Sequence, residues 1–393
     1  MKNLLIFGLL FLASCSKNNI EPQTSAPQEE KKQSCDFGIQ SFNLVKRPAV
    51  NSGYDEASKG RPKPGAGGTI TTTTPPPPAG AAVILLDFDG QLVSGTSWNY
   101  AGDINCAPAN LTADAINLIV QRVANDYSPF NVIITTDEAV FNATSGKRMR
   151  VIITESWEWY GQSGGVAFLN TFAVGSKTPC FVFSSLLSYN TKNIAEAASH
   201  EAGHTIGLYH QSTYDATGVK TSEYNSGVGT GETGWAPIMG VGYYRNLTLW
   251  HKGPNAMGAS SIQDDEAIIA AAVGYKADDY SNTLSGAVPI SSSMNALISN
   301  PSDVDFFSVN VLNTATLSIT PFNVGLNNIG ANVDLVLKIY NTVGIPVATY
   351  DNLNALNTEA VLTPGSYIIS VGAISNSYTS NYGMIGKYSI SLN

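Results

Sequence analysis

The sequence has few charged residues, few cysteines and few histidines. Only 13% of the 393 residues are charged, the net charge is -9 at pH 7, and there are 4 Cys and 4 His. The acidic balance argues against a nucleic-acid partner, because such proteins neutralise phosphates with Lys and Arg. Beyond the first residues no apolar run is long enough for a transmembrane helix. A hydrophobic fraction of 43% suffices for real cores, and the length predicts two or three compact units.

The first residues have the pattern of an export signal. Lys2 precedes an apolar run at residues 4–12 that is shorter than a permanent membrane helix. The run ends in Leu12-Ala13-Ser14-Cys15, which looks like a bacterial lipobox, where the cysteine is acylated and becomes the new N-terminus. We therefore expect a signal peptide at residues 1–14 and an exported bacterial lipoprotein. Its acyl chains would be its only membrane contact, at the outer membrane or cell surface, unless it is released extracellularly.

Residues 15–80 have a composition that does not support a hydrophobic core. The segment is rich in Gln, Lys, Pro, Gly and Thr, and it ends in four threonines followed by four prolines. A proline run favours extended polyproline II helix. We expect a disordered tether or pro-segment here.

Residues 81–279 alternate between strand-like and helix-like patterns. The apolar run at 82–87 is typical of a strand buried on both faces. Apolar side chains at helical spacing predict a helix at 113–127, with Thr112 as its candidate N-cap. Further strands are expected at 131–136, 148–154, 165–174 and 180–184, and a second helix at 194–205. This order predicts a mixed sheet flanked by helices.

Residues 280–393 have an all-β pattern, in which short apolar runs are separated by Asn, Gly and Pro turns. The composition changes near Asp278-Asp279, where we place the domain boundary. Strands are expected at 305–311, 316–319, 333–340, 366–372 and 388–392. The pattern predicts a β-sandwich.

Three of the four histidines fall in one motif. It matches HExxHxxGxxH at every specified position and reads His200-Glu201-Ala202-Gly203-His204-Thr205-Ile206-Gly207-Leu208-Tyr209-His210. Residues four apart on a helix share a face, so His200 and His204 can both direct an imidazole nitrogen at one ion. Gly207 lies where the chain must leave the helix for His210 to become the third ligand, and a positive φ is expected there. Three protein ligands leave a fourth zinc position open, as in catalytic sites.

This motif resembles that of the metzincin clan of zinc peptidases. The resemblance implies a Met-turn beneath the metal, and Ala236-Pro237-Ile238-Met239-Gly240 supplies one downstream. Some metzincins have a Tyr two positions after this Met as a helper in the transition state. Here that position is Val241, so Tyr243 or Tyr244 is left as the candidate helper. The implied fold is an α+β metzincin-like catalytic domain, a mixed twisted sheet with a zinc helix and Met-turn, followed by the all-β sandwich.

The clan also implies an edge strand that pairs with extended substrate, and residues 164–170 lie in the expected order for it. Segments at 86–90, 94–99, 127–132 and 135–137 resemble a group of secreted bacterial metzincins. Asp87 and Asp89 could bind Ca²⁺, although two carboxylates at a strand end more often cap a turn. Segments at 303–309, 334–340 and 364–371 resemble the pre-peptidase C-terminal domain, a module of secreted bacterial peptidases.

If Cys15 is acylated, three cysteines remain in an oxidising compartment. One pair with one leftover is the simplest accounting. Cys106 and Cys180 both lie in the well-patterned middle of the chain, so we expect them to form a disulfide, which leaves Cys35 free.

The resulting functional hypothesis is a secreted zinc metalloendopeptidase. One catalytic Zn²⁺ would be bound by His200, His204 and His210, with Glu201 as the general base that activates water against a peptide bond. We expect a monomer that acts on protein or peptide substrates, and His251 is expected at the surface. Two alternatives remain: an inactive envelope binding or adhesion protein on the same scaffold, and zinc hydrolysis of a non-peptide amide or ester.

A blocked active site is a further hypothesis for an exported peptidase. Pro-segments of metzincins often place a Cys or Asp on the metal, and Cys35-Asp36 lies in the N-terminal segment. Neither flanking sequence matches a known switch motif well.

Overall fold

The computed structural model describes residues 34–36, 77–323 and 330–393, all of which lie in one compact unit, Gln33–Asn393. The fold is mixed α/β, with many strands and few helices. The predicted signal peptide, Cys15 and most of the predicted tether lie outside the described residues. No helix within the described ranges is long and apolar enough to cross a membrane.

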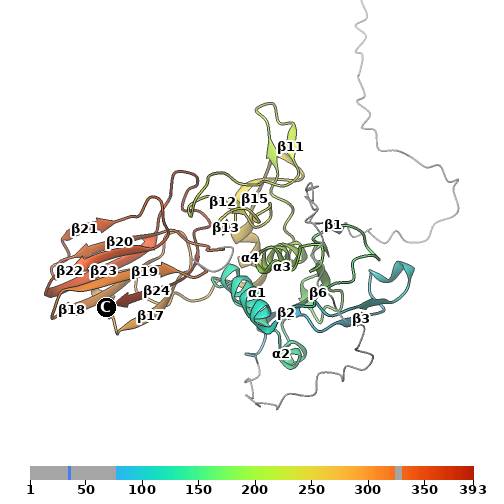
Figure 1. Cartoon of the computed structure of the whole chain (residues 1–393), viewed down its shortest axis with the longest axis horizontal. Helices are drawn as coiled ribbons and strands as arrows, with labels where there is room; N and C mark the ends of the chain where they lie inside the picture. The colour runs from blue at the N-terminus through green and yellow to red at the C-terminus, as the bar shows by residue number, and fades with distance from the viewer. Residues whose placement is uncertain (1–33, 37–76, 324–329) are drawn as a thin grey trace, which may run out of the picture. The chain divides into compact units, whose positions relative to one another are not determined.

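A seven-stranded sheet forms the first half of the unit (Figure 1). Its strand order is β1-β7-β9-β6-β2-β5, with β8 paired to β6. The strands are β1 (Ser34–Asp36), β2 (Ala82–Asp87), β5 (Val132–Thr135), β6 (Lys147–Thr154), β7 (Gly165–Phe168), β8 (Ala173–Val174) and β9 (Cys180–Phe183). β2, β5, β6 and β9 are parallel, whereas β7 is antiparallel to β9 and β1 is antiparallel to β7.

Helices cover both faces of this sheet because its central strands are apolar on both sides. The helices are α1 (Ala113–Asp126), α2 (Glu138–Ala143), α3 (Thr191–Ile206) and α4 (Asp265–Val273). In β2, Ile84 and Leu86 join the core under α1 and α3, while Val83 and Leu85 pack with Val140 of α2. The prediction of a strand buried on both faces is confirmed.

Helix α1 begins where the sequence predicted, because the Thr112 side chain accepts a hydrogen bond from the Ala115 N–H at 3.2 Å. The single strand expected at 165–174 is wrong, since β7 and β8 are separate. Asn170 has φ 58° between them, and its N–H donates to the His204 carbonyl at 3.3 Å. The break thus satisfies a carbonyl at the C-terminal end of α3.

Small two-stranded ladders surround the helices. They pair β3 (Gln91–Val93) with β4 (Ile104–Cys106), β10 (Thr213–Tyr214) with β11 (Lys220–Ser222), β12 (Trp235–Pro237) with β13 (Leu247–Leu249), and β14 (Lys252–Asn255) with β15 (Gly258–Asp264). Two 3₁₀ turns lie at Asn99–Ala101 and Leu284–Gly286.

The C-terminal part is a sandwich of two sheets. One has the order β16-β18-β23-β20-β21 and the other β17-β24-β19-β22. The strands are β16 (Val288–Pro289), β17 (Ser293–Ile298), β18 (Val304–Val311), β19 (Ala315–Pro321), β20 (Leu335–Tyr340), β21 (Pro346–Tyr350), β22 (Thr358–Leu362), β23 (Gly365–Ala373) and β24 (Gly386–Leu392). The five predicted strands are present. β16, β17, β21 and β22 were missed because polar residues interrupt their apolar patterns.

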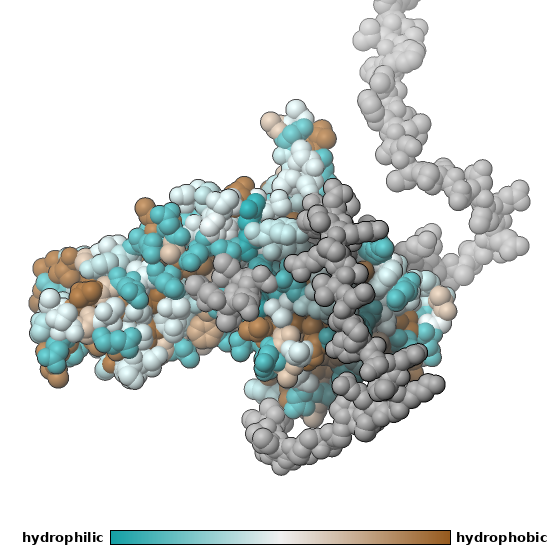
Figure 2. Space-filling view, viewed as in Figure 1, coloured by the Kyte–Doolittle hydropathy of each residue, from teal (hydrophilic) through white to brown (hydrophobic). Residues whose placement is uncertain are grey.

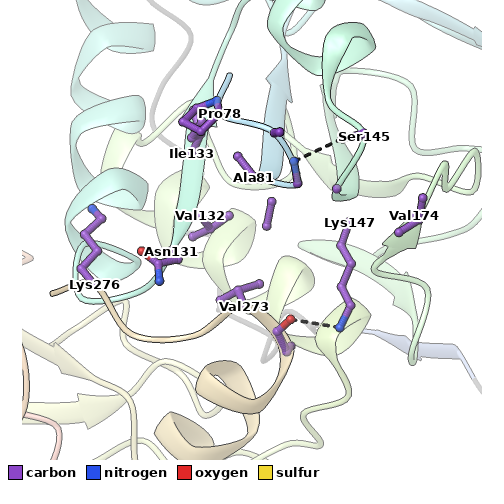
Figure 3. A pocket seen from close by; sticks show the side chains of 15 residues that line it. Pro78, Ala81, Asn131, Val132, Ile133, Ser145, Lys147, Val174, Val273 and Lys276 are labelled. Atoms are coloured by element: carbon purple, nitrogen blue, oxygen red, sulfur yellow. Dashed lines mark hydrogen bonds between the residues drawn. The ribbon is translucent and has the colours of Figure 1, made fainter. Parts of the chain in front are cut away.

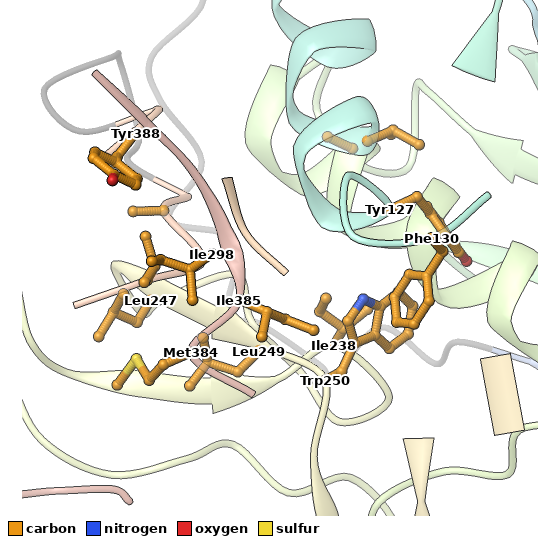
Figure 4. Close-up of a cluster of buried hydrophobic side chains, with 14 of the residues drawn as sticks. Tyr127, Phe130, Ile238, Leu247, Leu249, Trp250, Ile298, Met384, Ile385 and Tyr388 are labelled. Atoms are coloured by element: carbon orange, nitrogen blue, oxygen red, sulfur yellow. The ribbon is translucent and has the colours of Figure 1, made fainter. Parts of the chain in front are cut away.

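One hydrophobic cluster runs from the helices into the sandwich. Figure 4 draws Tyr127 and Phe130 beside Trp250, and Ile385 beside Leu249. Trp250 is 2% exposed, and its indole N–H donates to the Asp126 carbonyl at 2.7 Å. The apolar core is therefore shared between the two halves of the unit.

A buried polar bridge accompanies this apolar contact. The Asn332 amide donates to Asp126 at 2.8 Å and to the Thr248 carbonyl at 2.6 Å, and its oxygen accepts from Asn125 at 2.5 Å. The other Asp126 carboxylate oxygen accepts from Ser199, the residue before His200 on α3. Asn332 thus links the C-terminal part to the helix that carries the histidine motif.

Exposed apolar side chains also occur, and Figure 2 shows brown patches on an otherwise mixed surface. In the C-terminal part, Leu312 is 78% exposed and Val343 is 77% exposed. No described segment covers them, and scattered apolar residues are normal on protein surfaces.

The expected Cys106–Cys180 disulfide is wrong, because both residues are buried free thiols. Cys180 lies on β9 in the core beneath the helices, whereas Cys106 ends β4 and packs with the separate aromatic cluster around Trp98. Sequence spacing gave no information on which face of the sheet each thiol occupies.

Replacing Asn332 with Ala is expected to lower the free energy of unfolding by about 1–3 kcal/mol, because Asp126 loses a donor inside the protein. Thermal and denaturant unfolding of the full chain would measure the change. Asn295→Ala, at an exposed position on β17, is the matched control. Equal effects of the two substitutions would contradict a structural role for the bridge.

Candidate metal centre

Helix α3 holds the first two histidines inside the protein. Its N-cap is Asn190, whose side chain accepts from the N–H groups of Lys192 and Asn193. His200 and His204 are both 0% exposed and their ring centroids are 4.6 Å apart. Their four-residue spacing on one helix face brings the rings together, as the sequence predicted.

Gly207 ends the helix and redirects the chain toward the third histidine. It has φ 122°, and its N–H donates to the carbonyls of Gly203 and His204. This positive φ confirms the prediction, and residues other than Gly rarely adopt it. His210 then lies with its ring centroid 4.8 Å from that of His204 and 5.2 Å from that of His200.

Each imidazole is oriented by a partner at Nδ1. His200 Nδ1 lies 2.8 Å from the Ile238 carbonyl, and His204 Nδ1 lies 2.6 Å from the Leu208 carbonyl. His210 Nδ1 lies 2.7 Å from Glu223 Oε1. Since carbonyls and carboxylates only accept, Nδ1 carries a proton in all three rings, which leaves Nε2 as the atom that can ligate a metal.

The three rings point at a common place. One ligand atom from each lies within 4.8 Å of the others. The Nε2 atoms of His204 and His210 are buried without a hydrogen-bond partner. Burial lowers the pKa of His204 to about 3 and lowers that of His200 well below its usual value, with neighbouring histidines adding to both shifts. These observations fit a zinc ion bound by three Nε2 atoms.

Glu201 lies next to the triad and is 0% exposed. A Cβ on Gly165 of β7 would stand 2.7 Å from Glu201 Oε1, so only Gly allows this strand to pass so close to the carboxylate. The negative charge of Glu201 contributes to a raised pKa at Tyr243, after the larger effect of burial. Both β7 and Tyr243 therefore lie close to Glu201.

Met239 lies beneath α3, at the position that the resemblance implied for the Met-turn. A Cβ on Gly203 would stand 2.6 Å from Met239 Sδ, and both residues are fully buried. The Met239 carbonyl accepts from the Gln211 N–H at 2.7 Å, directly after His210. The 236–240 turn thus contacts the helix between its two histidines and fixes the chain after the third.

Two residues near the triad were not identified from the sequence. Glu223 orients His210 and also accepts from Lys220 Nζ at 2.6 Å. The His210 hydrogen bond is the main reason that the pKa of Glu223 falls to about 2. Tyr224 has its ring centroid 4.4 Å from that of His210. Neither belongs to the histidine motif, so no sequence signal marked them.

The two tyrosines predicted as helpers differ in position. Tyr243 is half-buried and electrostatically coupled to Glu201, whereas Tyr244 is 59% exposed. Tyr243, and Tyr224, which the sequence did not single out, are therefore better placed than Tyr244 to act as the helper.

Strand β1 occupies the free edge of β7. Its register pairs Ser34 with Phe168, Cys35 with Ala167, and Asp36 with Val166. Residues 164–170 were expected to form an edge strand that pairs with extended substrate, and in this structure a segment of the same chain is paired with β7. The pairing is antiparallel, like that of an added peptide strand.

Other predicted site residues lie apart from the triad. Asp87 forms an ion pair with Arg150 at 2.5 Å, Asp89 is exposed, and neither belongs to a group of three potential metal ligands in the described ranges. His251 is half-buried beside Trp235, at a ring distance of 4.9 Å, so its expected surface position is wrong. Burial lowers the pKa of His251 to about 4.

A cavity of about 600 Å³ lies at the amino ends of the parallel strands, away from the histidines (Figure 3). Ala82, Val132 and Lys147 line it, each at the start of a strand. Lys147 Nζ donates to the Ala272 carbonyl at 3.0 Å. No carboxylate lines the cavity, and it adds no residue to the histidine site.

Comparisons with known proteins give little about this site. No family model matches the chain, and no curated protein matches it. Among solved structures, the pre-peptidase C-terminal domain of collagenase from Bacillus anthracis is similar at 13% identity, covering 30% of this chain and 98% of that one, with a TM-score of 0.21.

Replacing Gly203 with Ala is expected to lower the free energy of unfolding by about 1–3 kcal/mol, because the new methyl overpacks against Met239. Unfolding measurements on the metal-free chain would show the change. In the Met239→Ala background the same substitution should cost less, since the contact is gone. Additive effects of the two substitutions would contradict direct packing of the turn on the helix.

Proposed function

We propose that this chain is a zinc metalloendopeptidase of the metzincin type, exported as a lipoprotein. The observation that carries the proposal is the convergence of three Nδ1-bonded imidazoles beside the buried carboxylate of Glu201. Three nitrogen ligands leave one zinc position open, as catalytic sites require.

The residues around the triad have distinct roles in this proposal. His200, His204 and His210 would hold zinc, which would polarise a carbonyl and lower the pKa of a bound water. Glu201 accepts a proton from the attacking water and passes it to the departing amine. Glu223 keeps the His210 ring in the ligating tautomer. Tyr243, near Glu201, can donate to the developing oxyanion.

Strand β7 supports a peptide substrate rather than a small amide or ester. Gly165 at its start lies against Glu201, so a strand paired along β7 runs past the general base. Main-chain pairing recognises any extended peptide, and alternate side chains then reach subsites. This arrangement suits cleavage within a chain.

Replacing Glu201 with Gln is expected to lower kcat for a protein substrate such as casein by at least about 100-fold, while zinc binding remains. Zinc content and peptide cleavage of the same preparations would be compared. Glu359→Gln, an exposed change of equal charge, serves as control. Zinc binding without cleavage by the parent chain would instead favour the envelope binding protein.

We further propose that residues 34–36 act as an intramolecular competitor for the substrate strand, which gives the latency hypothesis a backbone basis. Deleting residues 34–36 should lower KM for a peptide several-fold without changing kcat, because a competitor on the edge of β7 is removed. Steady-state kinetics would separate the two constants. Deleting residues 60–62 is the length-matched control, and an unchanged KM in the 34–36 deletion would contradict the proposal.

A further inference from the structure

The residues of β7 alternate between the two faces of the sheet. A Cβ on Gly165 would contact Glu201, and Ala167 belongs to the core under the helices, so both residues face α3. Val166 and Phe168 point the other way, into the separate aromatic cluster. The edge strand therefore offers a paired peptide two different surfaces.

Phe168 is held in place by Trp98. The centroids of the two rings lie 4.0 Å apart, and their planes are tilted by 34°. Trp98 is 3% exposed, its indole N–H donates to the Pro179 carbonyl at 2.7 Å, and its ring meets that of Phe181 edge-on at 5.4 Å. Because Trp98 is fixed by both kinds of contact, Phe168 is a half-buried ring of defined orientation on the edge strand.

The pairing of β1 shows which side chains of an added strand reach this ring. Directly opposed residues of an antiparallel pair share a face, with Cβ atoms about 4.5–5.5 Å apart. The register places Ser34 opposite Phe168 and Asp36 opposite Val166. A peptide in the same register directs alternate side chains to the aromatic face, and its residue opposite Phe168 lies against that ring.

The same register orients the peptide relative to Glu201. Strand β1 is antiparallel to β7, so a peptide in its place runs from Phe168 toward Gly165 in its own N-to-C direction. A peptide residue opposite Gly165 is next to Glu201, because Gly165 lies against that carboxylate. The residue opposite Phe168 therefore lies about three positions N-terminal to the residue beside Glu201.

We propose that Phe168, oriented by Trp98, is a specificity-determining residue that selects an aromatic or large aliphatic side chain in the peptide substrate. The inference rests on the peptidase proposal and names its substrate class, extended segments with such a residue on the N-terminal side of the cleaved bond. Opposed apolar and aromatic side chains stabilise an antiparallel pair, whereas a polar side chain loses water against the ring without gaining a partner.

The test measures peptide binding to the zinc-loaded Glu201→Gln variant of the full chain, so that no peptide is consumed. The probes are two polar peptides of about ten residues that are identical except for one central Phe or Ser. The Phe peptide should bind about 5–10-fold more tightly. Residues 34–36 compete with both peptides equally, so they leave this ratio unchanged. Equal dissociation constants for the two peptides would overturn the proposal.

Substitutions in the same background assign the preference to the ring. Phe168→Ala should reduce the ratio to about 2 or less, and Phe168→Leu should keep most of it, because Leu retains an apolar surface. Phe168→Thr, which keeps β propensity, takes the place of Phe168→Ala if the latter does not fold. Tyr100→Ala removes a 74% exposed ring near Trp98 and is the matched control, for which the ratio should not change. A ratio that persists in the Ala or Thr variant, or that is lost in the control, would contradict the subsite.

Cleavage of the Phe peptide by the chain with Glu201 intact is scored separately by mass spectrometry. The cleaved bond should lie about three residues C-terminal to the Phe. A cleaved bond on the N-terminal side of the Phe would overturn the proposed register. Phe-dependent binding without any cleavage would contradict the peptidase proposal alone and still support the subsite, so the two failures are distinguishable.

Discussion

The candidate metal centre depends on the orientation of three imidazole rings by acceptors from three separate segments. A helix alone can place His200 and His204 on one face, but it does not decide which nitrogen points inward. The carbonyls of Ile238 and Leu208 and the carboxylate of Glu223 make that decision, since each needs a proton on Nδ1. The turn before Met239, the helix C-terminus and the 223 loop are therefore all parts of one centre.

Close approach to this centre is possible because glycine stands at three positions. Gly203 admits Met239 beneath the helix, Gly165 lets β7 pass Glu201, and Gly207 supplies the positive φ that turns the chain toward His210. Two of these three glycines lie inside the histidine motif. The motif spacing thus encodes packing against the helix as well as the convergence of the three histidines.

What the sequence predicted about the site is local. The strand at 82–87, the Thr112 cap and the φ of Gly207 follow from patterns within a few residues, and the structure agrees. Contacts such as Glu223 with His210, or residues 34–36 with β7, depend on how loops close in space, which no short pattern records. The disulfide prediction failed for the same reason, because spacing does not show which core a thiol enters.

The C-terminal part contributes to the structure around the centre through Asn332. That residue bonds Asp126, Asp126 accepts from Ser199, and Ser199 precedes the first histidine on α3. The same junction shares an apolar core in which Trp250 is 2% exposed. Removing the sandwich would expose this core and take the Asn332 donor away from Asp126, so the two halves stabilise each other. A fixed helix then keeps the rings of His200 and His204 at a centroid separation of 4.6 Å, which allows both to face one ion.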